Sequence, residues 1–403
     1  MDDIFSGIRV VELAQYVFVP GAGALLADYG AEVIKVEMAD TGDPYRTLSI
    51  GDGREKAEVN IALEQNNRGK KSIAINVKTA EGRELLNKLI ASADVFVTSV
   101  RPQAIKRLKL DVEDVRACNP KIVYVRGNGF GFHGPEAGKP GYDSTAFWTR
   151  SGFATVLMHS EHVKPVRSRG ALGDHTGSTS VAYGIAAALF KRERSGQSVL
   201  VDVSLLATGM WVLSADIAAS QIPGYDSLLF ERRAPRFPLV GSYRTKDDRW
   251  VNLTFLHPDR DWPHLCRALG MHEYADDPRF ATNAERANNG VECGRLLAER
   301  FASRTWAEWK PIFDKLDAPW ELAQKIDEVL VDPQAIANGY VVDAEMSNGK
   351  TYKLISGPVA FNGRVPKKYT RAPKLGEHTG ALMLELGYAP GEVDRLRQTG
   401  VVK

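Results

Sequence analysis

One acidic residue stands among small residues directly before a long apolar stretch: Asp174, in the segment Gly170-Ala-Leu-Gly-Asp-His-Thr-Gly177. In one interpretation, its carboxylate caps the N-terminus of a helix and complements the helix dipole. In the other, the glycines on either side let a substrate carbonyl approach closely, and Asp174 acts as a nucleophile. Residue types and spacing alone leave both interpretations open.

A second segment has the spacing of a dinucleotide-binding loop. Gly129-Phe-Gly-Phe-His-Gly134 follows a predicted strand at 121–126. A dinucleotide fingerprint must open a helix, whereas Pro135, Gly138 and Pro140 follow here, so we predict a flexible loop at the rim of some other site. The nucleophile elbow, the P-loop and the zinc-protease motif are absent, and the scattered histidines predict no metal site.

Strands and helices alternate along the first half of the chain. The predicted strands are 8–13, 32–37, 71–77, 94–100, 121–126 and 198–204. The predicted helices are 20–29, 79–93, 111–118 and 175–194. This alternation indicates an α/β fold with a Rossmann-like, doubly wound parallel sheet, whose binding sites lie beyond the carboxyl ends of the strands.

The pattern changes near Ile222-Pro-Gly. Residues 241–254 predict a hairpin with its turn at 246–249, and mostly helical sequence follows to Trp320. We therefore expect a large α/β domain that begins with residues 1–220, a smaller α+β domain at 225–325, and a segment at 326–403 that returns to the large domain.

Composition excludes several classes of protein. The 403 residues are 44% hydrophobic and 25% charged, which fits a folded globular chain. The formal net charge of +2 argues against a nucleic-acid partner. The acidic first residues do not resemble an export signal, and the longest apolar stretch, 181–190, is too short to span a membrane. Three widely separated cysteines predict no disulfide framework, so we expect a cytoplasmic protein.

Short motifs run along nearly the whole chain. They are Gly7–Leu13, Leu26–Glu37, Gly42–Arg46, Asn67–Asn76, Arg101–Arg107, Pro140–Asp143, Gly173–Gly177, Tyr243–Trp250 and Leu375–Thr379. In their order and spacing these motifs resemble the class III CoA-transferases, which include the formyl-CoA, carnitine and phenyllactate CoA-transferases.

The resemblance implies a function and a mechanism. Asp174 matches the catalytic aspartate of the family, which attacks an acyl-CoA thioester and passes through a mixed anhydride to an aspartyl-CoA thioester. Asp143 matches an acidic position near the acyl site. CoA enters as a thioester substrate, together with a carboxylic acid, and no permanently bound cofactor is implied. The family forms interlocked homodimers, so a homodimer is expected.

The resemblance also implies which residues contact CoA. The candidates are Tyr16, Val17, Phe18, Ser99, Val100, Arg101, Arg107, Lys139 and Tyr142, with Arg68 as a further cationic candidate. Two positions depart from the family pattern: Ser99 replaces a common Asn, and Met38 replaces an Arg of formyl-CoA transferase. We therefore expect CoA to be held differently here.

The resemblance also bears on the substrate, and it leaves one alternative reaction, that of a racemase. The Gly-Asp-His sequence at 173–175 and the run at 242–248 are closer to the phenyllactate-type branch, which predicts an aryl or 2-hydroxy acid as substrate. The α-methylacyl-CoA racemases share the same fold and use a His/Asp pair within a Gly-His-Asp motif. This chain has Tyr142 at the histidine position, between Gly141 and Asp143, and a phenol with a pKa of ~10 is a poor base near neutrality.

Overall fold

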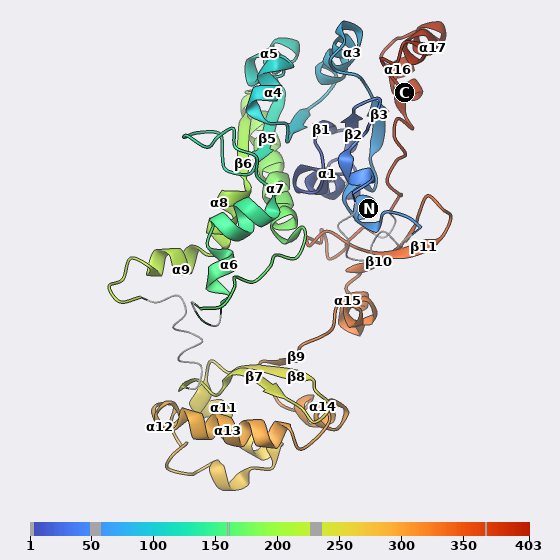
Figure 1. The fold of residues 1–403 in the computed structure, drawn as a ribbon. Coiled ribbons are helices and arrows are strands. Elements are labelled where there is room, and N and C mark those ends of the chain that lie inside the picture. Colours follow the sequence, from blue (N-terminus) through green and yellow to red (C-terminus); the bar gives the residue numbers. More distant parts are fainter. Residues whose placement is uncertain (1–3, 49–57, 159, 161, 226–235, 367–368) are drawn as a thin grey trace. The chain divides into compact units, whose positions relative to one another are not determined.

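Two compact units make up the chain. The computed structural model describes residues 4–48, 58–158, 160, 162–225, 236–366 and 369–403. The first unit comprises Met1–Leu157, Lys164–Ala218 and Asp332–Lys403, and the second comprises Met158–Val163 and Ala219–Val331 (Figure 1).

A six-stranded parallel sheet forms the centre of the first unit, in the order β3-β2-β1-β4-β5-β6. Its strands are β1 (Arg9–Leu13), β2 (Glu32–Glu37), β3 (Lys71–Ala74), β4 (Val95–Thr98), β5 (Val123–Asn128) and β6 (Leu200–Ser204). Val10 of β1 lies beside Val33 of β2 and Val95 of β4, so β1 is central and the strand order reverses next to it. The predicted parallel α/β sheet is confirmed.

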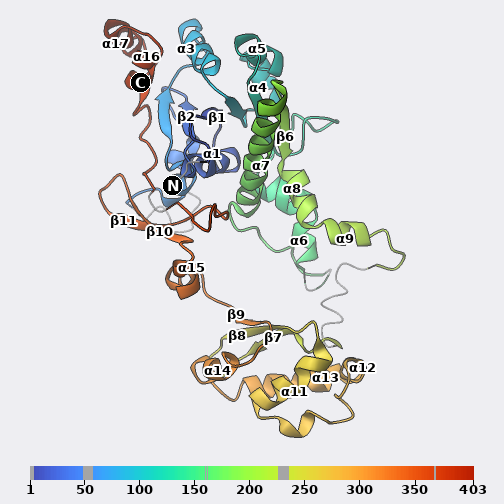
Figure 2. The ribbon, with the colours of Figure 1, turned by 180° about the vertical axis from the view of Figure 1, so that it is seen from behind.

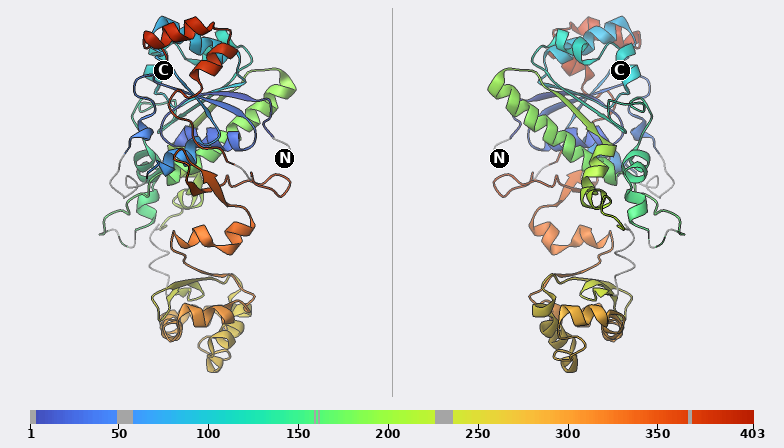
Figure 3. Two further views of the ribbon diagram at one scale, coloured as in Figure 1. Left: turned by 90° about the vertical axis from the view of Figure 1, so that its right-hand side faces the viewer. Right: turned by 90° about the vertical axis from the view of Figure 1, so that its left-hand side faces the viewer.

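Helices cover both faces of this sheet (Figure 3). On one face Val10, Val95 and Val123 pack against α1 (Phe18–Asp28) and α7 (Leu172–Ser195). On the other, Val11, Phe96 and Tyr124 pack against α3 (Ala80–Ala91), α5 (Val112–Cys118), α16 (Thr379–Glu385) and α17 (Pro390–Gln398). Neighbouring strand residues point to opposite faces, so the β-branched runs of these strands are buried on both sides.

Shorter elements complete the first unit. They are η1 (Pro44–Arg46), α2 (Ile61–Asn67), α4 (Pro102–Arg107), the π-helical η3 (Asp143–Arg150), α6 (Phe153–Val156), α8 (Leu205–Val212), α15 (Pro333–Ala337), β10 (Val341–Glu345) and β11 (Thr351–Ile355), while α9 (Ser214–Ala219) ends at the unit boundary. The chain returns to this unit after residue 331 (Figure 2). The backbone N–H of His378 donates to the carbonyl of Ser72, a residue of β3, at 2.9 Å.

The second unit has its own sheet and core. Strands β7 (Val240–Arg244), β8 (Trp250–Thr254) and β9 (Trp320–Leu322) are antiparallel, which confirms the predicted hairpin at 241–254. Its helices are α11 (Pro258–Leu269), η5 (His272–Tyr274), α12 (Asn283–Asn288), α13 (Gly290–Phe301), α14 (Trp306–Phe313) and η6 (Glu328–Val331). Buried aromatic side chains, among them Trp262, Phe301 and Trp309, fill the core.

The described residues carry no helix long and apolar enough to cross a membrane. Within the same residues, no cluster of three or more His, Cys, Asp or Glu side chains could hold a metal ion. Cys118, Cys266 and Cys293 are all free thiols.

Candidate active site

A cavity of about 490 Å³ opens at the carboxyl ends of β1, β2, β4 and β5 in the first unit. This is the point at which the strand order reverses, and parallel α/β sheets bind ligands in the crevice there. The volume falls within the roughly 300–1,000 Å³ of small-molecule sites. Residues that line it include Gln15, Tyr16, Phe18, Met38, Asp43, Ser99, Val100, Arg101, Asn128, Lys139, Tyr142, Asp174 and Leu205.

Asp174 lies in the first turn of α7, half-buried, with its side chain at this cavity. Within the described part of the chain, no hydrogen bond or ion pair reaches its carboxylate, so it is a partly desolvated and unpaired charge. Burial, and secondarily the nearby charge of Asp143, raises the pKa of Asp174 to about 7. A carboxylate with these properties is a candidate nucleophile or base.

Asp174 does not cap α7 by a hydrogen bond, so that part of the capping interpretation is wrong, whereas its place in the first turn does suit the helix dipole. Helix α7 begins at Leu172, before the predicted start at 175, and its N-cap residue is Ala171, which takes a left-handed conformation with φ of 69° and makes no side-chain cap. The acceptor comes from another element: Oδ1 of Asp143 accepts the backbone N–H of Gly173 at 2.8 Å. Asp143 thus serves the first turn of α7, and the carboxylate of Asp174 is left free for chemistry.

Asp143 is buried beneath this turn. Burial raises its pKa, while backbone hydrogen bonds from Gly173, Ala171 and Asp174 oppose the rise. Its Oδ2 atom has no hydrogen-bond partner among the described residues. Asp143 is absent from the cavity lining. It affects Asp174 in two ways: its charge raises the pKa of Asp174, and its hydrogen bond with Gly173 holds the first turn of α7.

The glycines around Asp174 serve packing. A Cβ atom added at Gly173 would collide with Oδ1 of Asp143 and with the ring of Phe147, and one added at Gly177 would collide with the ring of Phe18. Packing thus accounts for Gly173 and Gly177, and the close approach of a substrate carbonyl at these glycines stays a prediction.

The loop between β1 and α1 forms one wall of the cavity. Tyr16 takes a left-handed conformation with φ of 65°, which is uncommon for a residue other than glycine. Its backbone N–H donates to Oδ1 of Asp43 at 3.2 Å. Its ring meets that of Tyr142 edge-on, with 5.7 Å between the centroids. Burial, together with Tyr142 and Asp43, raises the pKa of Tyr16.

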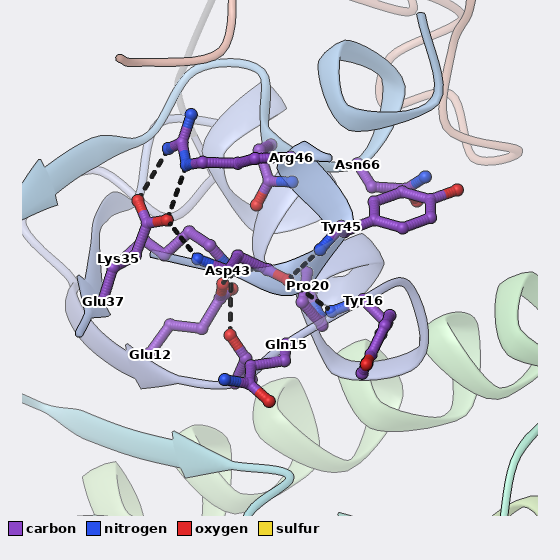
Figure 4. A network of polar contacts seen from close by, with 12 residues as sticks. Glu12, Gln15, Tyr16, Pro20, Lys35, Glu37, Asp43, Tyr45, Arg46 and Asn66 are labelled. Carbon is purple, nitrogen blue, oxygen red and sulfur yellow. Dashed lines mark hydrogen bonds and ion pairs between the residues drawn. The ribbon is translucent and has the colours of Figure 1, made fainter. Parts of the chain in front are cut away.

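Buried charges lie behind this loop (Figure 4). Nζ of Lys35 is 2.9 Å from Oδ2 of Asp43 and 3.3 Å from Oε1 of Glu12. Burial alone would lower the pKa of Lys35, but Asp43, Glu12 and Glu37 raise it to about 12. Burial would raise the pKa of Glu37, yet a hydrogen bond from Arg46 and the charge of Lys35 lower it to about 2. The sequence analysis assigned no role to this cluster. The signal that could have revealed it is the presence of charged side chains within otherwise apolar strands.

Most of the predicted CoA-contacting residues meet at this cavity. Tyr16, Phe18, Ser99, Val100, Arg101, Lys139 and Tyr142 line it. Val17 is buried against Tyr45 and Leu63 instead. Arg107 is exposed at the end of α4, outside the lining, and Arg68 is buried in an ion pair with Asp28 at 2.6 Å. The structure thus brings together seven of the predicted residues and leaves Val17, Arg107 and Arg68 apart from them.

The sequence predicted that the glycine-rich segment at 129–134 is a loop at the rim of a site, but it assigned no ligand to this loop. Gly127, Asn128 and Gly129 line the cavity, and the amide of Asn128 exchanges hydrogen bonds with the backbone of Gly131 at 2.7 Å. The chain then turns without a helix until Asp143, which confirms the predicted loop. No histidine is among the described residues that line the cavity, so the His/Asp pair of a racemase has no counterpart there.

Comparison with known proteins supports the family resemblance that the short sequence motifs indicate. The family model described as CoA-transferase family III matches residues 5–379. The chain is 31% identical to (R)-2-hydroxy-4-methylpentanoate CoA-transferase of Clostridioides difficile, over 99% of this chain and 100% of that protein. It is 33% identical to cinnamoyl-CoA:phenyllactate CoA-transferase of Clostridium sporogenes, over 98% and 96% of the two chains.

A solved structure agrees with the fold. A CAIB/BAIF family protein from Brucella suis superposes with a TM-score of 0.81 and 29% sequence identity, over 96% of this chain and 100% of that one. The match of the family model to nearly the whole chain, and the length shared with both transferases, leave no large segment unaccounted for. This chain belongs to CoA-transferase family III and is a CoA-transferase.

Proposed function

We propose that this enzyme transfers CoA from an acyl-CoA donor to a free carboxylic acid through a covalent intermediate on Asp174. The observation that carries the proposal is the state of that side chain. Asp174 faces the cavity without a partner, whereas Glu37 and Asp43, the other acidic residues of the lining, are ion-paired with Arg46 and Lys35. An unpaired carboxylate is available to attack a carbonyl carbon.

The proposed reaction begins with a carboxylate oxygen of Asp174 at the thioester carbonyl carbon of the donor. The C–S bond breaks, the CoA thiolate leaves, and Asp174 and the acyl group form a mixed anhydride. The thiolate then attacks the Asp174 carbonyl carbon, which releases the donor acid as its carboxylate and leaves an aspartyl-CoA thioester. No proton is gained or lost overall in this half-reaction.

The second half-reaction repeats these steps in reverse with a different acid. The acceptor carboxylate attacks the aspartyl-CoA carbonyl and expels the thiolate, which then attacks the acceptor's acyl carbon and frees Asp174. Water would hydrolyse either intermediate, so the site must exclude it while the thiolate is held close. The half-buried position of Asp174 in the first turn of α7 favours that exclusion.

CoA is proposed to lie along the carboxyl ends of β1, β4 and β5. Arg101 and Lys139 supply cationic groups at the cavity, which suit the phosphates of CoA. Lys139 is within 3.0 Å of Glu136 on an exposed loop, and it can exchange this partner for a phosphate at little cost. The phenol rings of Tyr16 and Tyr142 and the ring of Phe18 offer apolar surface beside them.

The proposed acid is an aryl or 2-hydroxy acid. The names of two relatives support this proposal, because one acts on a 2-hydroxy-4-methylpentanoate and the other on cinnamoyl-CoA and phenyllactate. A panel of aryl, 2-hydroxy and short dicarboxylic acids offered to one donor thioester tests this choice, and a preference for the dicarboxylic acids would contradict it.

Isotope exchange tests the covalent route. With donor thioester and labelled donor acid but no acceptor, the aspartyl-CoA route returns label to the thioester. Asp174→Asn should abolish this exchange, by at least about 1,000-fold, because an amide is a poor nucleophile. Asp202→Asn is the matched control, since Asp202 pairs with Arg126 outside this cavity. Exchange that persists in Asp174→Asn would contradict the proposal.

We also propose an interlocked homodimer. Large apolar side chains are exposed on α7 and α8 of the first unit, where Tyr183, Phe190 and Trp211 are 77%, 65% and 79% exposed. The adjoining edge strand β6 carries the exposed Leu200. Large exposed apolar side chains on neighbouring elements are typical of protein interfaces, and a second copy of this chain is the proposed occupant.

A further inference from the structure

We propose that Asp43 is a positioning residue for CoA binding: together with Lys35, it holds the backbone of Tyr16 in its left-handed conformation, so that the β1–α1 loop forms one wall of the CoA cavity. The inference rests on the proposed location of CoA. Asp43 lies outside the reaction itself, and acts through the loop that it holds.

The loop needs such support because Tyr16 adopts φ of 65°. Residues with a Cβ atom are disfavoured in this region, and they remain there only when the surroundings fix them. The N–H of Tyr16 donates to Oδ1 of Asp43 at 3.2 Å, and the same oxygen accepts the N–H of Tyr45 at 2.9 Å. Asp43 thereby joins the β1–α1 loop to the segment that follows β2.

The buried charged side chains form hydrogen bonds with the backbone at three places between β1 and the first turn of α1. Lys35 donates to the carbonyl of Ala14 at 2.9 Å, Asp43 accepts from Tyr16, and Lys70 donates to the carbonyl of Pro20 at 2.7 Å. Glu12 links the two lysines, because its carboxylate is 3.3 Å from Lys35 and 2.9 Å from Lys70. The cluster therefore holds the β1–α1 connection in place, while Ala14, Tyr16 and Phe18 line the cavity beside Asp43.

A second side of the cluster is also fixed. The N–H of Asp43 donates to Oε2 of Glu37 at 3.0 Å, and Glu37 accepts two hydrogen bonds of 2.7 Å from Arg46. Gly23 in α1 leaves space for the carboxylate of Glu12, because a Cβ atom at this position would collide with Oε2. Buried ion pairs contribute little net stability compared with apolar packing, so their value here lies in fixing one loop conformation.

The test measures CoA affinity by titration calorimetry with CoA itself. Asp43→Asn keeps the size of the side chain and removes the charge that faces Lys35. We expect the dissociation constant for CoA to rise about tenfold, and KM for the acyl-CoA donor to rise with it, while kcat changes less than threefold. A change in KM without a change in kcat distinguishes a residue that shapes the binding site from one that touches the reacting atoms.

A double-mutant cycle tests the role of the backbone. Glycine takes positive φ without strain, so Tyr16→Gly removes the need for Asp43. The tenfold effect of Asp43→Asn should therefore shrink to less than threefold in a Tyr16→Gly background. If Asp43→Asn alone does not fold, Tyr16→Gly should restore folding, and a failure to restore it, or a full tenfold effect of Asp43→Asn in the Tyr16→Gly background, overturns the inference.

Asp28→Asn is the matched control. Asp28 and Arg68 form a buried ion pair in the same unit, each side chain 2% exposed, outside the cavity lining. This variant should lose thermal stability and keep the wild-type affinity for CoA. Equal losses of affinity in Asp28→Asn and Asp43→Asn would overturn the inference and leave the proposed function intact. A wild-type protein that binds no CoA would overturn both.

Discussion

Asp174 combines two properties that act against each other. For the proposed attack on a thioester its carboxylate must be ionised, yet burial and the charge of Asp143 favour the neutral form and raise its pKa to about 7. A carboxylate whose charge is weakly solvated is more reactive once it is ionised, because less solvent must be removed before it attacks. The enzyme is therefore expected to depend on pH near neutrality.

The pH profile gives the first prediction. At low donor concentration kcat/KM should rise with pH and level off above about 7, since only ionised Asp174 reacts. Asp143→Asn removes a neighbouring negative charge, so the pKa of Asp174 should fall and the acid limb should move by roughly 1 pH unit to lower pH. An acid limb that moves upward or stays in place in Asp143→Asn would argue against this coupling.

Stability gives the second prediction. The pKa of Asp174 rises from 3.8 to about 7 on folding, so the folded state binds this proton more tightly and loses stability as pH rises through that range. Asp174→Asn carries no such charge, and it should be more stable than wild type at pH 8 by on the order of 1–3 kcal/mol. The gain should be clearly smaller at pH 5 and vanish only below about pH 3.8, where the carboxyl is protonated in the unfolded chain as well. Urea unfolding at the two pH values measures it, and a variant less stable than wild type at pH 8 would contradict the account.

Residue roles were only partly predictable from sequence. Asp174, whose catalytic role stays a prediction, and seven of the predicted CoA-contacting residues do line the cavity. The cap of α7 could not be predicted, because Asp143 lies 30 residues from the N–H that it accepts. Nor could the left-handed backbone of Tyr16, since tyrosine rarely adopts it and the reason lies in the distant Asp43.

At the scale of elements, the first turn of α7 carries the proposed chemistry. The strands and helices that surround α7 could be predicted from the sequence, because runs of β-branched residues separated by helices predict parallel strands. The start of α7 was placed too late because Ala171, an alanine with φ of 69°, replaces the expected cap. Here tertiary contacts from η3 decide the boundary, whereas local propensity does not.

Gly173→Ala tests this turn. The added Cβ would collide with Oδ1 of Asp143 and with Phe147, so either the helix start or Asp143 must move. We expect a loss of roughly 1–3 kcal/mol in stability from overpacking. We also expect a fall in kcat of at least tenfold, because Asp174 is the next residue.

A matched glycine serves as the control for that variant. Gly294 lies in α13 of the second unit, and a Cβ added there meets nothing within 4 Å. Gly294→Ala should stabilise the protein by about 0.5–1 kcal/mol, as expected for a helix interior, with kcat unchanged. Thermal melts and steady-state kinetics of the two variants measure both effects, and a Gly173→Ala enzyme with normal kcat would refute the proposed role of this turn.

At the scale of the whole molecule, the strand order 3-2-1-4-5-6 puts one cavity where the order reverses beside β1. The class of fold was readable from the alternation of elements, and the location of the site followed from it. The partner of the exposed apolar face on α7 and α8 was not readable in this way, because one chain does not show what covers it.

Oligomeric state supplies the last of these predictions. Trp211→Glu places a charge on the exposed apolar face and should hinder assembly, so that refolded protein gives a smaller dimer fraction than wild type in sedimentation velocity. Interlocked subunits cannot separate without unfolding, so differently tagged wild-type dimers should not exchange subunits over days under native conditions. A wild-type monomer, or rapid exchange between the tagged dimers, would contradict the proposed assembly.

The most direct measurement traps the covalent intermediate. The enzyme is incubated with a pool of acyl-CoA donors, hydroxylamine is added, and the peptide that contains Asp174 is analysed by mass spectrometry. The account predicts a hydroxamate on Asp174 that depends on the donor, and the donor that forms it names the substrate class. A hydroxamate on another residue, or none with any turned-over donor, would contradict the central claim.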